Sequence, residues 1–182
     1  MLQQPDRIPH SYDLAPPSSE HLPWYGIRTK PKHERTAAKS LESKGYEHYL
    51  PVYRTRRRLS DRVIEAEQPL FPGYVFCRFD ASTRLPIITT PAVISVVGFG
   101  NEPAPIPDAE IAAIQAILHS GLTTEPVPFL REGQRIRVNR GALEGLEGIL
   151  LKQKSEWRMV VSVTMLQRSI SVEIDREWIS SV

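Results

Sequence analysis

Residues 68–79, QPLFPGYVFCRF, decide how the rest of the chain is arranged. Pro69 and Pro72 interrupt regular structure, and Gly73 allows a turn before an extended segment begins. Alternate residues of a strand fall on opposite faces. One face carries Tyr74, Phe76 and Arg78, and the other carries Val75, Cys77 and Phe79.

Two apolar faces leave two interpretations of this strand open. The face with Val75 suits a domain core because its side chains are small or smooth. The face with Tyr74 is then a candidate for an exposed aromatic patch, which is typical of a docking surface. Alternatively, both faces are buried, one under helices and one under another loop. The members of the candidate patch are Phe71, Pro72, Tyr74 and Phe76.

The composition is that of an ordinary soluble protein of one large or two small domains. The chain has 182 residues, of which 41% are hydrophobic and 24% charged. It contains no apolar run of membrane-spanning length, and its start does not resemble a signal peptide. Cys77 is the single cysteine, which excludes an internal disulfide and a multi-cysteine metal site. We therefore expect a cytoplasmic protein.

The net charge of +2 hides an uneven distribution. Residues 28–62 contain eleven Lys or Arg and four Asp or Glu, whereas residues 102–130 contain four acids and no Lys or Arg. A basic block of this kind favours an anionic partner such as nucleic acid. An ordinary solvated basic face is the alternative.

Up to residue 120 the pattern predicts an α+β sandwich. Residues 1–23, with five prolines, are expected to form a disordered arm. A helix over 33–45 would bury Ala37, Ala38 and Leu41 and expose a basic ridge on the other side. The other expected elements are strands over 24–30, 48–54, 63–69, 74–79 and 93–99, a short helix or turn over 82–90, and a helix over 108–120.

The remaining sequence predicts a second, all-β unit. Residues 121–130 contain two prolines and are interpreted as a linker. From residue 131 onward, five short strand segments alternate with polar turns, which predicts a small β-barrel of SH3-like size. The five segments are QRIRV, GILLK, WRMVVSV, SISVEID and WISSV.

The motifs of both units resemble one family. WYGIRTKPKHE, LPVYR, PLFPGYVF and VGFG resemble the amino-terminal (NGN) domain of NusG-type transcription elongation factors, and GQRIRVNRGALEGLEGILL resembles their KOW motif. The motifs cover about residues 24–182 in the family's order. Within the family the sequence is most similar to specialised antiterminators of the RfaH and UpxY type. The resemblance implies an NGN-like α/β sandwich with an antiparallel sheet over 24–120, followed by a five-stranded KOW barrel over 131–182.

The resemblance also implies partners for the first domain. Its apolar face would bind the clamp helices of RNA polymerase, and its first helix would contact non-template DNA of the transcription bubble. Arg28 stands where a paralogue can have an aromatic residue, so that edge of the face differs. The implied polymerase-binding residues are Phe71, Pro72, Tyr74, Phe76, Val97 and Phe99. The implied DNA-binding residues are Lys30, Lys32, His33, Arg35 and Lys39.

For the KOW barrel the resemblance implies a small-subunit ribosomal protein or the termination factor Rho as partner. The implied contacts are Leu143, Leu146, Met165 and Leu166, for which a place in the barrel core is the alternative. In one paralogue this domain can refold as a helical hairpin. The β-branched residues here favour strands, so we expect the barrel.

These observations predict a monomeric factor that suppresses pausing or termination, and not an enzyme. The five histidines are scattered, and the sequence has neither a phosphate-binding glycine loop nor a zinc pattern. No cofactor is therefore expected. The competing interpretation is a general RNA-binding or ribosome-associated protein, because KOW barrels also occur there. It leaves the aromatic patch unexplained.

Overall fold

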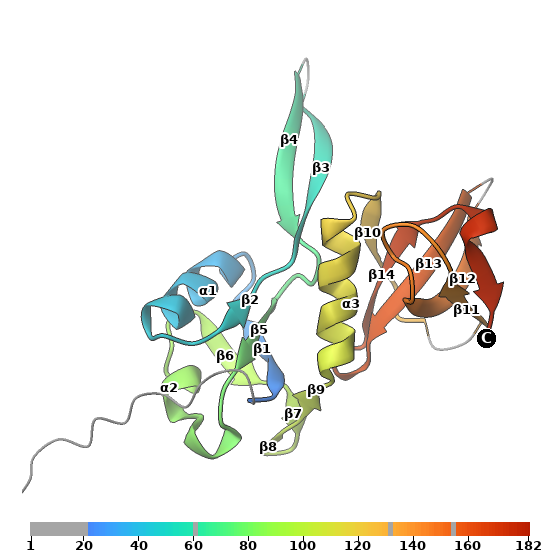
Figure 1. Ribbon diagram of the computed structural model, residues 1–182. Coiled ribbons are helices and arrows are strands. Elements are labelled where there is room, and N and C mark those ends of the chain that lie inside the picture. Colours follow the sequence, from blue (N-terminus) through green and yellow to red (C-terminus); the bar gives the residue numbers. More distant parts are fainter. Residues whose placement is uncertain (1–21, 60–61, 131–132, 154–155) are drawn as a thin grey trace, which may run out of the picture.

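The structure, a computed structural model, describes residues 22–59, 62–130, 133–153 and 156–182 (Figure 1). The arm predicted over residues 1–23 lies outside the described residues as far as residue 21. Within the described ranges, none of the helices is long and apolar enough to cross a membrane.

The amino-terminal half is built on an antiparallel sheet with the order β2-β5-β1-β6, in which β9 also pairs with β1. The residues predicted to decide the fold form the strand β5 next to the centre of this sheet. The strands are β1 (Trp24–Thr29), β2 (His48–Tyr49), β5 (Tyr74–Arg78), β6 (Val93–Val96) and β9 (Pro105–Ile106).

Helices cover both faces of this sheet. On one face, α1 (Glu34–Ser43) and α2 (Leu85–Ile88) close a core that contains Ile27, Val75 and Leu41. A short 3-10 turn, Ala81–Thr83, leads into α2. On the other face, α3 (Asp108–His119) buries Ile111, Ile114 and Ile117 in a second core. The predicted sandwich and the predicted positions of these helices are confirmed.

Two predicted strands are each divided in the structure. The strand expected over 48–54 becomes β2 and β3 (Val52–Leu59), because Pro51 has no N–H to continue the pairing. β3 pairs with β4 (Arg62–Pro69) in a hairpin that projects from the body (Figure 1). The strand expected over 93–99 becomes β6 and β7 (Gly98–Phe99). β7 pairs with β8 (Glu102–Pro103).

The carboxy-terminal half is an antiparallel sheet with the order β10-β14-β13-β12-β11-β15. Five of its strands correspond to the five predicted segments, which confirms the barrel. They are β11 (Gln134–Val138), β12 (Glu147–Gln153), β13 (Glu156–Val163), β14 (Arg168–Glu173) and β15 (Ile179–Ser181). The 3-10 turns Thr164–Leu166 and Arg176–Trp178 connect strands within this sheet.

The sixth strand, β10 (Thr124–Val127), lies in the segment that the sequence assigns to a linker. It pairs antiparallel with β14 at the edge of the barrel sheet. An edge strand tolerates Pro126, whose missing N–H would interrupt a central strand. The linker is therefore partly built into the barrel.

The two halves share one hydrophobic core. Trp24 and Phe76 of the sheet, Ile114 of α3, and Val161 and Leu166 of the barrel belong to the same buried cluster. We call the resulting position of the barrel, with its Thr164–Leu166 turn against β1 and α3, the closed arrangement. The backbone N–H of Thr164 donates a 3.3 Å hydrogen bond to Glu110 Oε2 of α3.

Candidate interaction surfaces

Strand β5 separates two chemically different faces, as its alternation predicts. Val75, Cys77 and Phe79 are buried beneath α1 and α2. Burial raises the pKa of the Cys77 thiol to about 12, so the thiol stays protonated and unreactive at neutral pH. This face is structural.

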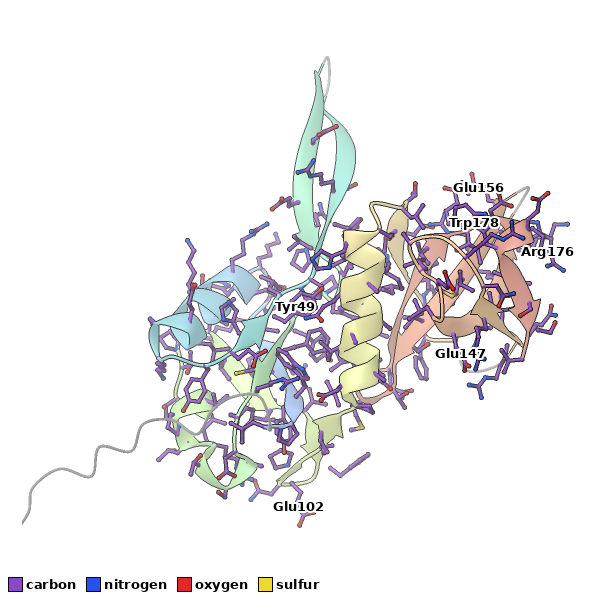
Figure 2. The ribbon with its side chains drawn as sticks, viewed as in Figure 1. Tyr49, Glu102, Glu147, Glu156, Arg176 and Trp178 are labelled. Carbon is purple, nitrogen blue, oxygen red and sulfur yellow. The ribbon has the colours of Figure 1, made fainter. Side chains whose placement is uncertain are left out.

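The opposite face carries the predicted aromatic patch. Phe71 and Phe76 meet edge to face with ring centroids 5.5 Å apart, and Tyr49 of β2 stacks 6.3 Å from Phe76. Tyr49 lies on the side of the sheet that faces α3 (Figure 2). Burial raises its pKa to about 12. The patch is thus a packed aromatic cluster.

Of the two interpretations left open for this patch, burial holds for Phe71 and Phe76, which are 1% and 0% exposed. α3 and the barrel contribute apolar side chains to the same cluster and exclude water from the two rings. Tyr74 and Val97 are half-buried at its border, whereas Pro72 is exposed and Phe99 is 75% exposed. In the closed arrangement only part of the predicted polymerase-binding set faces solvent.

A buried carboxylate that the sequence analysis missed fixes the turn before β5. Glu34 Oε1 accepts a 2.7 Å hydrogen bond from the backbone N–H of Gly73, and the Gly73 carbonyl accepts one of 2.8 Å from Thr29 N–H. Glu34 stands three, four and seven residues before Ala37, Ala38 and Leu41, which places it on the buried side of α1. This spacing is the sequence signal from which the burial of Glu34 could have been predicted.

The five predicted DNA-binding residues are exposed, three of them just before α1 and two on its first six residues. Arg35 forms a 3.1 Å ion pair with Glu67 of the hairpin, which joins α1 to the base of β4. His33 Nδ1 lies 2.8 Å from the Pro31 carbonyl and must donate there, because a carbonyl only accepts. Nε2 is then left for another partner. The group is Lys30, Lys32, His33, Arg35 and Lys39.

The hairpin adds basic positions next to this group. In the backbone register, Glu67 and Glu65 lie opposite Arg54 and Arg56 near the base of the hairpin. Arg57 and Arg58 lie opposite Ile64 and Val63 instead. In the backbone register of the described residues, acidic positions therefore face arginines only in the basal half.

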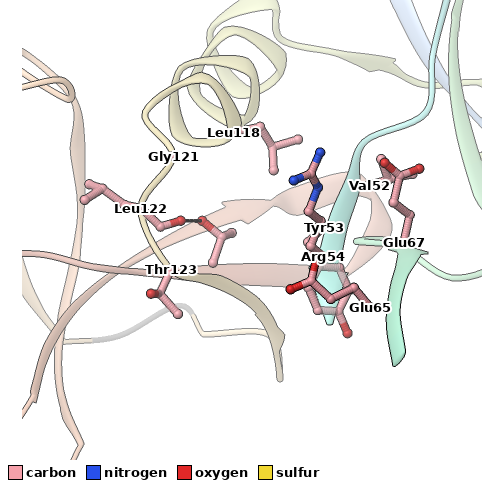
Figure 3. A pocket seen from close by; sticks show the side chains of 10 residues that line it. Val52, Tyr53, Arg54, Glu65, Glu67, Leu118, Gly121, Leu122 and Thr123 are labelled. Atoms are coloured by element: carbon pink, nitrogen blue, oxygen red, sulfur yellow. Dashed lines mark hydrogen bonds between the residues drawn. The ribbon is translucent and has the colours of Figure 1, made fainter. Parts of the chain in front are cut away.

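A groove of about 700 Å³ separates the hairpin base from the segment between α3 and β10 (Figure 3). Its lining mixes apolar, hydroxyl and oppositely charged side chains, with no group of three or more potential metal ligands anywhere in the described residues. None of the residues that line this groove was predicted as a site residue from the sequence. They are Val52, Tyr53, Arg54, Glu65, Glu67, Leu118, Gly121, Leu122, Thr123 and Thr124.

The four predicted KOW contacts are largely covered. Leu143 is 3% exposed inside the barrel, and Leu146 is half-buried beside it. Leu166 is 5% exposed and packs over β1, while the neighbouring Met165 is half-buried against the same cluster. These residues serve the barrel core and the contact between the two halves.

The sheet of four strands and β9, flanked by three helices and followed by an antiparallel barrel, matches known proteins. The family model described as NusG, transcription termination factor nusG, matches residues 22–115. The chain belongs to the NusG family. Members of this family are non-enzymatic transcription factors, so the chain is not an enzyme.

Relatives and a solved structure extend the match beyond the first domain. The transcription termination/antitermination protein NusG of Helicobacter pylori (strain ATCC 700392 / 26695) is 24% identical over 171 residues, covering 84% of this chain and 94% of the relative. The protein of the same name from Lactococcus lactis is 26% identical over 173 residues, covering 87% and 92%. A structure titled "Domain interaction in Thermotoga maritima NusG" covers 90% of this chain and 99% of that chain, with a TM-score of 0.54 and 19% identity. It confirms the predicted α+β fold. These relatives are NusG proteins proper, so the narrower RfaH and UpxY assignment does not follow from them.

Proposed function

We propose that this NusG-family protein is a cytoplasmic, monomeric transcription elongation and antitermination factor that binds the clamp helices of RNA polymerase through its first domain. The observation that carries the proposal is the aromatic cluster around Phe76 on the face of β5 that lies towards α3. A partner that binds the elongating state of the polymerase better than paused states would shift the population toward elongation. The same proposal includes a first domain over 24–120 and a KOW domain over 131–182, joined by a linker over 121–130 whose strand β10 pairs with the barrel sheet.

The closed arrangement means that this docking face has to be uncovered first. Leu166 of the barrel packs directly over Gly26 of β1, beside the cluster. Tyr74 and Val97 are half-buried against the cluster to which the barrel contributes. Phe99 and Pro72 are already exposed and would make the first contact.

We propose that the basic start of α1 contacts the non-template strand. Its five exposed residues provide phosphate contacts that fix position without reading sequence. The Glu34–Gly73 hydrogen bond ties this helix to the turn before β5, so docking and DNA contact would share one rigid frame.

The barrel would recruit a second protein, a small-subunit ribosomal protein or Rho, through Leu143, Leu146, Met165 and Leu166. Because Leu166 contacts the first domain in the closed arrangement, such a partner would require the barrel to move away from the first domain.

We also propose that the chain is of the specialised RfaH and UpxY type. This assignment rests on the sequence motifs. A pausing assay on templates with and without a candidate recruitment element tests that assignment, since a general NusG protein would act on both.

Binding to a reconstituted elongation complex tests the function, with pausing followed on the same template. The variant to use is Tyr74→Ala in a Leu166→Glu background, which uncovers the face and then removes one border ring. Val182→Glu, on the exposed carboxy-terminal residue of the barrel, is the matched control for the added charge. Binding by Leu166→Glu that Tyr74→Ala weakens supports the proposal. Binding to folded RNA without binding to polymerase would replace it with the RNA-binding interpretation.

A further inference from the structure

We infer that β10 is a strap that keeps the barrel next to the first domain, and that full release of the barrel requires β10 to peel from β14. The consequence for polymerase access rests on the function proposed above. The strap itself rests on the contacts of residues 120–130 alone.

The strap is held along its whole length. Thr124, Glu125, Pro126 and Val127 pair with Val172, Ser171, Ile170 and Ser169 of β14. At one end, Glu173 N–H donates 3.0 Å to the Thr123 carbonyl. At the other end, Leu130 N–H donates to Ser169 Oγ, and Ser162 Oγ donates to the Leu130 carbonyl, at 3.1 and 3.0 Å.

A buried arginine fastens the middle of the strap. The side chain of Arg158 on β13 is 5% exposed, and its Nη2 lies 3.1 Å from Glu125 Oε1 of β10. Its Nε donates to Ser171 Oγ, and its Nη1 lies 3.5 Å from Glu156 of its own strand. Glu125 itself is 45% exposed, so the pair is weaker than a fully buried one, but losing Glu125 would leave the buried guanidinium with only Ser171 and Glu156 as partners.

The chain before the strap is too short to let the barrel leave. Ser120 ends α3, and the chain from Ser120 to Thr124 spans at most about 14 Å when fully extended. A unit of the barrel's size is about 25 Å across, so a tether of this length keeps the barrel adjacent to α3 even if the barrel swings about it. With β10 detached, the chain from Ser120 to Gln134 reaches about 50 Å.

The start of the strap is itself ordered by local bonds. Ser120 Oγ accepts from Leu122 N–H at 3.2 Å, and Thr124 Oγ1 donates to the Leu122 carbonyl at 3.0 Å. Figure 3 shows Leu122, whose carbonyl accepts this second hydrogen bond, beside the groove that separates this segment from the hairpin. The barrel sheet therefore holds the strap in place.

Small-angle scattering of the full chain with a lockable strap tests this inference. Val127→Cys and Ser169→Cys introduce a disulfide between β10 and β14, because directly paired residues have Cα atoms about 4.5–5.5 Å apart. Leu166→Glu is added to release the barrel from β1. We expect the radius of gyration to rise by several ångströms in the reduced form and to stay near the wild-type value in the oxidised form. Gly26→Val replaces Leu166→Glu if that variant does not fold.

Equal radii in the oxidised and reduced forms, whether large or small, would overturn the inference, because the detached strap would then add no freedom. Glu125→Gln in the same background without the cysteines should also raise the radius. Its matched control is Glu156→Gln, which removes an acid from the same arginine but leaves the strap intact. An equal effect of both variants would contradict the role of Glu125. None of these readouts involves polymerase, so a failed strap and a failed docking proposal are distinguishable.

Discussion

Gly26 is a residue at which the two halves of the molecule come close together. A Cβ atom placed on Gly26 would lie 2.8 Å from Leu166 Cδ2 and 3.2 Å from Val97 Cγ2. The absence of a side chain therefore lets the barrel rest on β1. Since Leu166 is the flexible end of a side chain, a methyl group could be accommodated by a small shift, but a larger group could not.

We predict that Gly26→Val opens the closed arrangement. Its branched side chain occupies the space of Leu166, so the hydrophobic contact between the halves is lost while β1 keeps its pairing. Hydrogen exchange should show faster exchange around residues 164–166 and unchanged protection in β5. Gly100→Val, in a turn with open space around it, is a control for an added side chain, although its positive φ makes it locally strained. Unchanged exchange at 164–166 would contradict the prediction.

Phe76 and Tyr74 share a face but differ in what they do for the fold. Because Phe76 is fully buried, Phe76→Ala should lower the free energy of unfolding by about 3–5 kcal/mol. Tyr74→Ala should cost about 1 kcal/mol, since Tyr74 is half-buried. Urea unfolding measures both. Equal costs would show that Phe76 does not belong to the core. Because Phe76→Ala is expected to destabilise the fold, a loss of binding by this variant would not by itself test docking.

Glu110 makes the closed arrangement sensitive to pH. Burial raises the pKa of this carboxyl, and the Thr164 N–H bond opposes the shift only in part. The closed arrangement therefore binds a proton more tightly than an open one in which Glu110 is solvated. The stabilisation is fully present below the ordinary carboxyl pKa and is lost as the pH rises through the raised value.

We accordingly predict that the radius of gyration of the wild-type chain increases as the pH is raised from below the ordinary carboxyl pKa through the raised pKa of Glu110. Glu110→Gln should abolish that part of the dependence, because the amide does not titrate. Glu147→Gln is a suitable control on the barrel, since the neighbouring Arg137 and Arg135 lower the pKa of Glu147 rather than raise it. A Glu110→Gln curve that follows the wild-type curve would be inconsistent with this account.

At the scale of elements, the start of α1 and the base of the hairpin form one basic region. Arg35 is partly neutralised by Glu67, whereas Lys39 has no ion pair with any acid that the structure describes. We predict that Lys39→Gln weakens binding to the elongation complex and reduces the salt slope by about 0.7, the value for one contact to a single strand. Lys152→Gln on the barrel should leave the slope unchanged. The same slope in both variants would exclude α1 from the DNA contact.

Elements with a clear local pattern were predictable from the sequence. The alternation in residues 74–79 gave the two faces of β5, and the small stripe of Ala37, Ala38 and Leu41 gave the orientation of α1. β10 was not predictable in this way, because Pro126 and Pro128 argue against a strand. Its pairing depends on a free edge of β14, which lies more than forty residues further along the chain.

At the scale of the whole molecule, the burial of Phe71 and Phe76 could not be read from their own strand. It depends on α3 and on the barrel, both of which follow in the chain and meet the face only in the folded molecule. From the alternation of the strand alone, exposure and burial of this face remain alternatives. The closed arrangement reconciles them: an apolar face suited to docking is buried by another part of the same chain.

We propose that the barrel covers a polymerase-docking face. Comparing the binding of wild type and Leu166→Glu to a reconstituted elongation complex tests this proposal most directly. If the open state of the wild type is rare, its apparent affinity is reduced by the open fraction. We predict that Leu166→Glu binds about tenfold more tightly and that Tyr74→Ala in that background removes the gain. Equal affinity of wild type, Leu166→Glu and Val182→Glu would contradict the account.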